Sequence, residues 1–126
     1  MKIINILFAM AALALSATAS ALDVKPYTEA NFAKAQAEGK ATAVHFHADW
    51  CPTCKRQAAS IETLKSDKAL DVTIFVANYD SESPLKKKLG VNAQSTFVVY
   101  KGTTEKGRMA GGTSPEAIKL VLQKAL

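Results

Sequence analysis

The 126-residue sequence predicts an α/β fold, in which a central mixed sheet is flanked by helices on both faces. Two observations predict this fold. Segments rich in apolar and β-branched residues alternate with helical patterns, and such alternation produces a sheet whose crossover helices cover both faces. The last two strand-like segments are separated only by the short turn Lys101-Gly102, so we expect them to pair as an antiparallel hairpin.

The strands are predicted from runs of apolar and β-branched residues. Ala41 to His47 alternates in the manner of a strand. Val72 to Ala77 is continuously apolar and β-branched, which is typical of a strand covered on both faces. In chain order, the predicted strands are Leu22 to Tyr27, Ala41 to His47, Val72 to Ala77, Thr96 to Tyr100 and Thr104 to Met109.

The helices are predicted from their capping residues and their apolar spacing. Thr28 and Ser114 are typical N-caps, and Pro52 and Pro84 suit the first helical position, where a backbone N–H has no intrahelical partner. Gly90 suits the end of a helix. The predicted helices are Thr28 to Glu38, Pro52 to Ser66, Ser83 to Gly90 and Ser114 to Ala125. The expected buried stripe of the second helix is Cys54, Ala58, Ile61 and Leu64.

Composition indicates one ordinary globular domain. Apolar residues make up 48% of the chain and charged residues 21%, whereas disordered segments are poorer in the former and richer in the latter. Two cysteines can form neither a disulfide framework nor a Cys₄ zinc site. The net charge is +5, and the only basic run is Lys86 to Lys88. We interpret this run as a solvated helix face, so no nucleic-acid partner is predicted, and a monomer is expected.

The first 21 residues have the pattern of a secretory signal peptide. Met1 and Lys2 give a positive start, Ile3 to Leu15 is apolar apart from one asparagine, and Ser16 to Ala21 consists of small residues. We predict cleavage after Ala21, with Ala17-Thr18-Ala19 as the second choice of cleavage site, and residues 22–126 as the mature domain. An uncleaved anchor is the alternative, but the apolar segment is shorter than the roughly 20 residues that a spanning helix needs. The expected location is therefore periplasmic or secreted, where any thiol pair meets an oxidising environment.

The only two cysteines lie at a junction between a predicted strand and a predicted helix. The intervening Pro52 and Thr53 place Cys51 at the start of the helix and Cys54 one turn inside it. Free N–H groups and the positive end of the helix dipole stabilise a thiolate at Cys51. We therefore predict that Cys51 is a solvent-accessible attacking thiol and that Cys54, on the buried stripe, resolves the mixed disulfide.

The segment from Phe46 to Lys55 resembles the active-site segment of the thioredoxin superfamily. An aromatic residue, Trp50, precedes the first cysteine, and a basic residue follows the second. The likeness covers the mature chain: Asn78 to Asp80 ends the third strand as in thioredoxins, and Gly111 stands where the family has a glycine before its last helix. The resemblance implies a thioredoxin-like fold and a protein thiol–disulfide oxidoreductase without a cofactor.

The resemblance also implies roles for individual residues. Cys51 and Cys54 are the expected catalytic residues, with Trp50, Pro52 and Thr53 in support. Ala48 to Cys51 resembles exported members that accept electrons from a membrane thiol transporter, which implies a membrane-bound redox partner besides protein thiols and disulfides. A proline directly after the first cysteine instead resembles oxidising members. The direction of electron flow stays open, with reduction or isomerisation favoured.

Three departures from the family pattern affect the expected site. His45 stands where thioredoxins bury an acid; it is either the base for the Cys54 proton or a core residue. Val76 replaces the lysine that accompanies that acid. Ser95 replaces the cis-proline that faces the disulfide, and we expect the Gln94–Ser95 bond to be trans, because a non-proline cis bond costs about 2.5–4 kcal/mol. Gln94 and Ser95 remain the expected substrate-binding residues, with strand addition weakened.

Two other classes of function compete with the oxidoreductase. The first is a metal-binding or metal-delivery domain that uses Cys51, Cys54 and His45, with His47 as a fourth ligand. Two thiolates and two imidazoles form a tetrahedral set for zinc, and the sulfurs also suit monovalent copper. His47 is otherwise expected to be structural. The second is a redox-inert binding module, which requires Cys51 to be unreactive.

Overall fold

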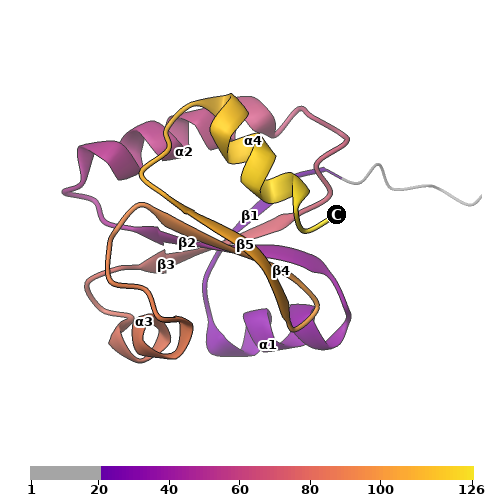
Figure 1. Cartoon of the computed structure of the whole chain (residues 1–126), viewed down its shortest axis with the longest axis horizontal. Coiled ribbons are helices and arrows are strands. Elements are labelled where there is room, and N and C mark those ends of the chain that lie inside the picture. Colours follow the sequence, from indigo (N-terminus) through magenta and orange to yellow (C-terminus); the bar gives the residue numbers. More distant parts are fainter. Residues whose placement is uncertain (1–20) are drawn as a thin grey trace, which may run out of the picture.

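A five-stranded sheet with the strand order β1-β3-β2-β4-β5 forms the centre of the molecule (Figure 1). The computed structural model describes residues 21–126, so the predicted signal peptide lies, but for Ala21, outside the described residues. In chain order, the elements are β1 (Asp23–Pro26), α1 (Glu29–Ala37), β2 (Ala41–His47), α2 (Pro52–Leu64), β3 (Thr73–Asn78), α3 (Ser83–Leu89), β4 (Thr96–Lys101), β5 (Thr104–Ala110) and α4 (Pro115–Gln123).

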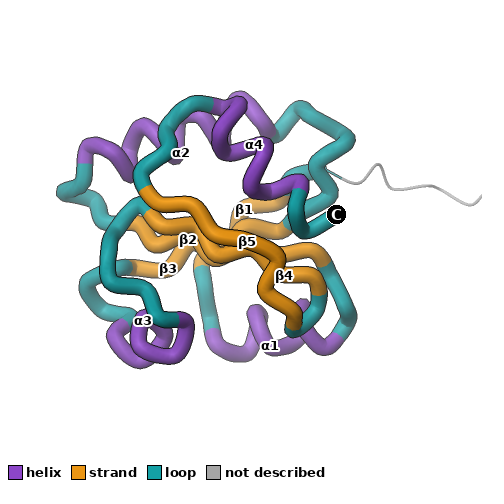
Figure 2. The backbone as a smooth tube through the Cα atoms, in the orientation of Figure 1, coloured by secondary structure: helices purple, strands orange, loops and turns teal. Residues whose placement is uncertain are grey.

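The sheet is mixed, as the sequence predicts. β1 and β2 both pair in parallel with β3, whereas β4 pairs antiparallel with both β2 and β5. In this register His45 of β2 lies between Val76 of β3 and Phe97 of β4. The hairpin of β4 and β5 confirms the expected pairing of the last two strands. Figure 2 shows the strands as one layer between two layers of helices.

Helices cover both faces of the sheet and create two apolar cores. α2 and α4 lie on one face, and α1 and α3 lie on the other (Figure 1). Under α2 and α4, the core includes Ile61, Leu64, Phe97, Ile118 and Leu122. Under α1 and α3, it includes Phe32, Val44, Phe46, Phe75 and Leu85. β2 is buried on both sides from Ala41 to Phe46, so the loop that follows it starts from a fixed strand end.

The helix boundaries follow local hydrogen bonding. Thr28 caps α1 by accepting a hydrogen bond from the Asn31 N–H, and Ser114 caps α4 in the same way through the Ala117 N–H. Gly90 ends α3 with a φ of +65°, a left-handed conformation that glycine adopts without a steric penalty. These are capping positions that the sequence predicts.

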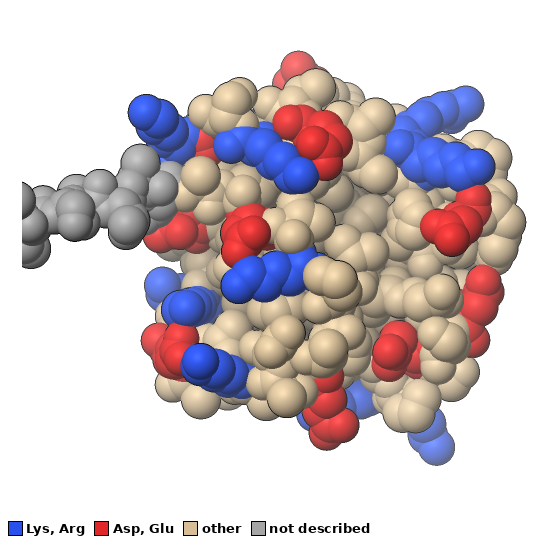
Figure 3. Space-filling model, turned by 180° about the vertical axis from the view of Figure 1, so that it is seen from behind, with Lys and Arg blue, Asp and Glu red and all other residues tan. Residues whose placement is uncertain are grey.

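Charged side chains of both signs cover the outside of the domain. On the face drawn in Figure 3, Lys and Arg side chains alternate with Asp and Glu side chains. Lys119 of α4 pairs with Asp67 at 2.7 Å, and Arg108 of β5 pairs with Glu105 at 2.6 Å. Within residues 21–126, none of the helices combines the length and the apolar character that crossing a membrane requires.

Thr42 of β2 provides a test of this core. Its hydroxyl is fully buried and is the one buried side-chain polar group without a hydrogen-bond partner among the described residues. Burying an unpaired hydroxyl is unfavourable. We therefore expect Thr42→Val to raise the free energy of unfolding by about 1 kcal/mol, measured by urea denaturation.

Thr96 is the matched control for this substitution. Its Oγ1 donates to the Ala93 carbonyl at 2.7 Å, so Thr96→Val removes a hydrogen bond and should lower the free energy of unfolding. A Thr42→Val variant less stable than the wild type would show that the Thr42 hydroxyl is satisfied in solution.

Candidate active site

The two cysteines lie at the N-terminus of α2, as the spacing predicts, and both are free thiols. Cys51 is the N-cap: its Sγ accepts a hydrogen bond from the Cys54 N–H at 3.1 Å. Pro52 occupies the first turn, where its missing N–H leaves no hydrogen bond unmade. The sulfur of Cys51 thus takes the place that an oxygen of Ser or Asp takes in ordinary helix caps.

Cys51 is less accessible than the sequence predicts. Only 2% of the residue is exposed, because its side chain turns inward to cap α2 instead of outward to solvent. Its neighbours Trp50 and Pro52 are exposed, so the sulfur lies directly beneath the surface. Cys54 is fully buried, as expected from the stripe on α2.

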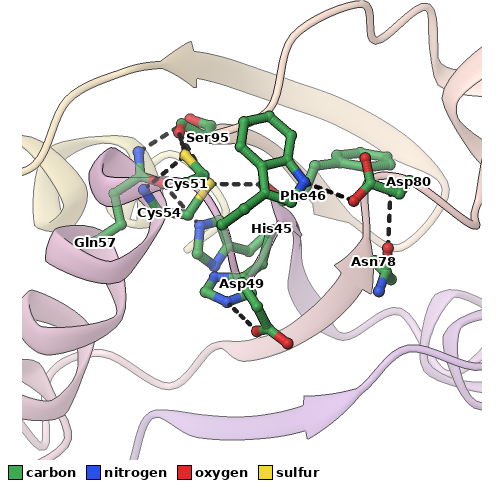
Figure 4. Close-up of polar contacts among 11 residues, drawn as sticks. His45, Phe46, Asp49, Cys51, Cys54, Gln57, Asn78, Asp80 and Ser95 are labelled. Carbon is green, nitrogen blue, oxygen red and sulfur yellow. Dashed lines mark hydrogen bonds and ion pairs between the residues drawn. The ribbon is translucent and has the colours of Figure 1, made fainter.

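Ser95 places its hydroxyl against both sulfurs (Figure 4). The Ser95 Oγ lies 3.3 Å from the Cys51 Sγ and 3.1 Å from the Cys54 Sγ. The residue has a φ of +65°, the only positive φ of a non-glycine residue in the described part of the chain. None of the described peptide bonds is cis, which confirms the expected trans bond between Gln94 and Ser95.

The backbone of Ser95 is fully engaged within the protein. Its N–H donates to the Phe46 carbonyl at 2.9 Å, and its carbonyl accepts from the Gly111 N–H at 3.1 Å and from the Gln57 Nε2 at 3.0 Å. The residue is 3% exposed. The backbone N–H and carbonyl of Ser95 are therefore both occupied within the protein, and its role as a substrate-binding residue stays a prediction. Gln94, the other residue of that prediction, is half-buried.

The two thiols differ in acidity. Burial raises the pKa of Cys51, but hydrogen bonds from Cys54, Ser95 and the backbone outweigh burial and hold this pKa below its ordinary value. Burial raises the pKa of Cys54, and its hydrogen bond to Cys51 raises it further, so the net shift is upward. The thiolate therefore forms at Cys51, the first residue of the pair.

Gln57 is a site residue that the sequence analysis missed. It is fully buried on α2, whereas Ala58, assigned to the buried stripe, is only half-buried. The Gln57 Nε2 donates to the carbonyls of Ser95 and Gly112, and its Oε1 lies 2.8 Å from the His45 Nε2. The available signal was the spacing: Gln57 lies three residues after Cys54 and four before Ile61, on the same helix face.

The hydrogen bonds of Gln57 determine the proton position on His45. Because the Gln57 amide nitrogen faces two carbonyls, its oxygen must face His45, so the neutral imidazole carries its proton on Nε2. The ring is stacked on Phe97 at 4.2 Å between centroids. Burial lowers the pKa of His45 to about 4, against the opposing effect of the Gln57 hydrogen bond. The His45 Nε2 is hydrogen-bonded to Gln57, and the role of His45 as the base for the Cys54 proton stays a prediction.

The remaining residues predicted for the site make hydrogen bonds outside the contact between the sulfurs and Ser95. Trp50 is 59% exposed, and its Nε1 donates to the Asp80 Oδ2 at 2.7 Å. Asp80 is itself held by its backbone N–H, which donates to the Asn78 Oδ1 at 2.9 Å (Figure 4). His47 is half-buried, and its Nε2 lies 3.2 Å from the Asp49 Oδ1. Thr53 is half-buried, and its backbone contributes a hydrogen bond that lowers the pKa of Cys51.

The structure does not support the alternative metal site. Among residues 21–126, no three His, Cys, Asp or Glu side chains form a group that could hold a metal ion. The His45 Nε2 is already committed to Gln57, and the His47 Nε2 lies against Asp49. The two imidazoles therefore do not complete a ligand set with the sulfurs.

Comparison with known proteins identifies the family to which this fold and its Cys pair belong. Residues 23–124 match the model of the Thioredoxin family. The chain belongs to the thioredoxin family, in agreement with the resemblance of its active-site segment. A crystal structure of a protein called Trxlp, from Edwardsiella tarda EIB202, is similar with a TM-score of 0.75 and 38% identity, over 79% of this chain and 98% of that one.

Curated relatives include both disulfide isomerases and thioredoxins. Protein disulfide isomerase-like 2-1 of Oryza sativa subsp. japonica is 35% identical over 80% of this chain and 28% of its own length. A thioredoxin H-type of Brassica campestris is 33% identical over 65% of this chain and 66% of its own length. The chain spans 28%, 31% and 33% of the length of three isomerase relatives, so it corresponds to one part of each.

The buried neutral His45 predicts a specific acid sensitivity. Its pKa is lowered from 6.5 to about 4 by folding, so its contribution to stability is complete above pH 6.5 and is lost as the pH falls toward 4. We expect the wild type to lose about 3 kcal/mol more unfolding free energy than His45→Gln between about pH 7 and pH 4. Carboxylates shared by both proteins cancel in this difference, and parallel pH profiles would contradict the prediction.

Proposed function

We propose that this protein is an exported thiol–disulfide oxidoreductase that exchanges electrons between its Cys51–Cys54 pair and protein disulfides. The observation that carries the proposal is the acidity difference within the pair: the pKa of Cys51 is lowered and that of Cys54 is raised. One thiol is thereby poised as a nucleophile at neutral pH while the other keeps its proton. A disulfide that only stabilises the fold does not require one thiol to have a lower pKa than the other.

The proposed reduction takes two exchange steps. The Cys51 thiolate attacks one sulfur of a substrate disulfide, forms a mixed disulfide and releases the other half of the substrate as a thiolate. Cys54 then gives its proton to the released thiolate and attacks the Cys51 Sγ, which releases the second substrate thiolate and leaves a Cys51–Cys54 disulfide. Two electrons pass to the substrate. The helix start places the two sulfurs one turn apart, so the second step needs little backbone movement.

The direction and the location are further parts of the proposal. Reduction or isomerisation is supported by the likeness of Ala48 to Cys51 to exported reducing members of the family, and by relatives that are named disulfide isomerases. Export is supported by the signal-peptide pattern of residues 1–21. An exported reductant must be recharged from a reducing compartment, which is why we include a membrane-bound redox partner.

Trapping with a model protein disulfide tests the roles of the two cysteines. Cys54→Ser removes the resolving thiol, so mixed disulfides should accumulate on Cys51, visible by mass spectrometry. Cys51→Ser should yield about tenfold less adduct, because the remaining thiol is buried and its pKa is raised. The variant lacking both cysteines is the blank. Equal trapping by the two single variants would refute the assignment.

The reduction potential tests the direction of exchange. Equilibration with glutathione buffers, followed by thiol quantification, should place the pair between about −270 mV, the value of a reducing thioredoxin, and about −180 mV, that of an isomerase. A value near −120 mV would instead assign the protein to the oxidants. A chain whose cysteines do not interconvert in any buffer would be a redox-inert binding module.

A further inference from the structure

Ser95 contacts both reacting sulfurs from a backbone conformation that few serines adopt. We propose that its hydroxyl bridges the two cysteines: it lies against the Cys54 thiol and donates its proton to the Cys51 thiolate. Ser95 then controls the reactivity of Cys51, a role beyond the substrate binding that the sequence predicts. This inference rests on the proposed thiol–disulfide exchange and adds a residue to it.

The charge on Cys51 assigns the direction of the hydrogen bond between Ser95 and that sulfur. A hydroxyl carries one proton, so it can donate to only one of the sulfurs, which lie 3.3 and 3.1 Å from it. Cys54 keeps its proton to higher pH than Cys51, since burial raises its pKa. A charged sulfur is the better acceptor, so the hydroxyl proton goes to the Cys51 thiolate. The thiolate then has the Ser95 hydroxyl as a donor besides the Cys54 thiol and the backbone N–H groups, among them that of Cys54 at 3.1 Å.

The backbone of Ser95 is held so that the hydroxyl points at the sulfurs. A φ of +65° is uncommon for a residue with a Cβ, and such conformations persist only where the surroundings enforce them. Here the N–H is held by Phe46 and the carbonyl by Gly111 and Gln57. These three hydrogen bonds fix the backbone of Ser95. Backbone strain at a reacting centre is the expected sign of a functional constraint.

The same geometry excludes the proline that the family has at this position. A proline ring fixes φ near −65° and removes the N–H, whereas Ser95 has a φ of +65° and donates its N–H to Phe46. This loop therefore presents a hydroxyl group to the sulfurs from a different backbone conformation. The replacement changes the chemistry beside the thiolate, because an apolar ring cannot donate a hydrogen bond.

The bridge affects the redox equilibrium because it stabilises only one side of it. Oxidation of the reduced pair joins the Cys51 and Cys54 sulfurs, and its two electrons reduce a substrate disulfide to two thiolates, one of which takes the Cys54 proton. The disulfide carries no negative charge for the hydroxyl to stabilise. The hydroxyl therefore favours the reduced form and makes the pair more oxidising than it would otherwise be.

Two substitutions of Ser95 isolate the hydroxyl from the backbone strain. Ser95→Ala removes the hydroxyl and keeps a Cβ at positive φ, whereas Ser95→Gly removes the hydroxyl and relieves the strain. Ser60→Ala is the matched control, because it deletes a hydroxyl of α2 that donates to the Thr113 carbonyl. The Cys51 thiolate is followed by its ultraviolet absorbance against pH, and the potential is measured in glutathione buffers.

We expect both Ser95 variants to raise the midpoint of thiolate formation by about one pH unit, as loss of a hydrogen bond to the charged form requires. The matching tenfold change in the redox equilibrium moves the potential about 30 mV more negative. Ser60→Ala should change neither quantity. If Ala poorly tolerates the positive φ, Ser95→Gly still carries the test.

Three outcomes would overturn the bridge. Unchanged midpoints in folded Ser95→Ala and Ser95→Gly proteins would show that the hydroxyl does not donate to the thiolate. A shift in Ser95→Ala alone would assign the effect to backbone strain. An equal shift in Ser60→Ala would show that it is not specific to Ser95. Failure of the proposed function looks different, because the wild type itself would then form no reversible disulfide in the same buffers.

Discussion

The buried amide of Gln57 connects the four segments from which the site is built. It sits on α2, contacts His45 on β2, and donates to carbonyls of the loops before β4 and before α4. A primary amide has two N–H donors and one carbonyl oxygen, and all three are used. The hydrogen bonds depend on one another. The two carbonyls orient the amide, and the amide oxygen then fixes the proton on His45. The hydrogen bond to the Ser95 carbonyl also holds that loop where the Ser95 hydroxyl contacts the sulfurs. Buried networks with every member satisfied specify one arrangement.

The acidity of Cys51 arises from hydrogen bonds and not from a neighbouring ion. Its pKa is lowered by the Cys54 thiol, the Ser95 hydroxyl and backbone N–H groups. His45 is neutral at physiological pH, and Val76, its neighbour on β3, carries no charge. Fixed dipoles at short range are screened little by dissolved salt, in contrast to ion pairs at the surface. The nucleophile is therefore prepared by local geometry, which is set by the start of α2 and the loop before β4.

Most of the fold could be predicted from the sequence, because it depends on local patterns. The β-branched runs, the caps Thr28 and Ser114, and Pro52 at a helix start each determine an element within a few residues. The site was predicted less completely. The spacing of Cys51 and Cys54 indicated a helix start, but the inward turn of Cys51 depends on its own role as the cap.

The parts that were missed depend on contacts between distant residues. Gln57 differs from a solvent-exposed glutamine only through partners 12 to 55 positions away along the chain. The conformation of Ser95 likewise follows from Phe46, Gly111 and Gln57, which no local pattern brings together. The helical spacing allowed either Gln57 or Ala58 to face inward, and hydrophobicity favoured the wrong one. Polar residues inside a core are where patterns of apolar residues give the least guidance.

Because the Cys51 sulfur caps α2, the helix and the nucleophile share one hydrogen bond. A thiolate is a better acceptor than a sulfur bonded to another sulfur, so the Cys54 N–H is held more tightly in the reduced protein than in a mixed or internal disulfide. Linkage makes this dependence mutual. Any contact that orders the first turn of α2 therefore favours the reduced form of the Cys51–Cys54 pair, and reduction of the pair in turn orders the first turn of α2. The order of the first turn of α2 thus depends on the redox state of the pair.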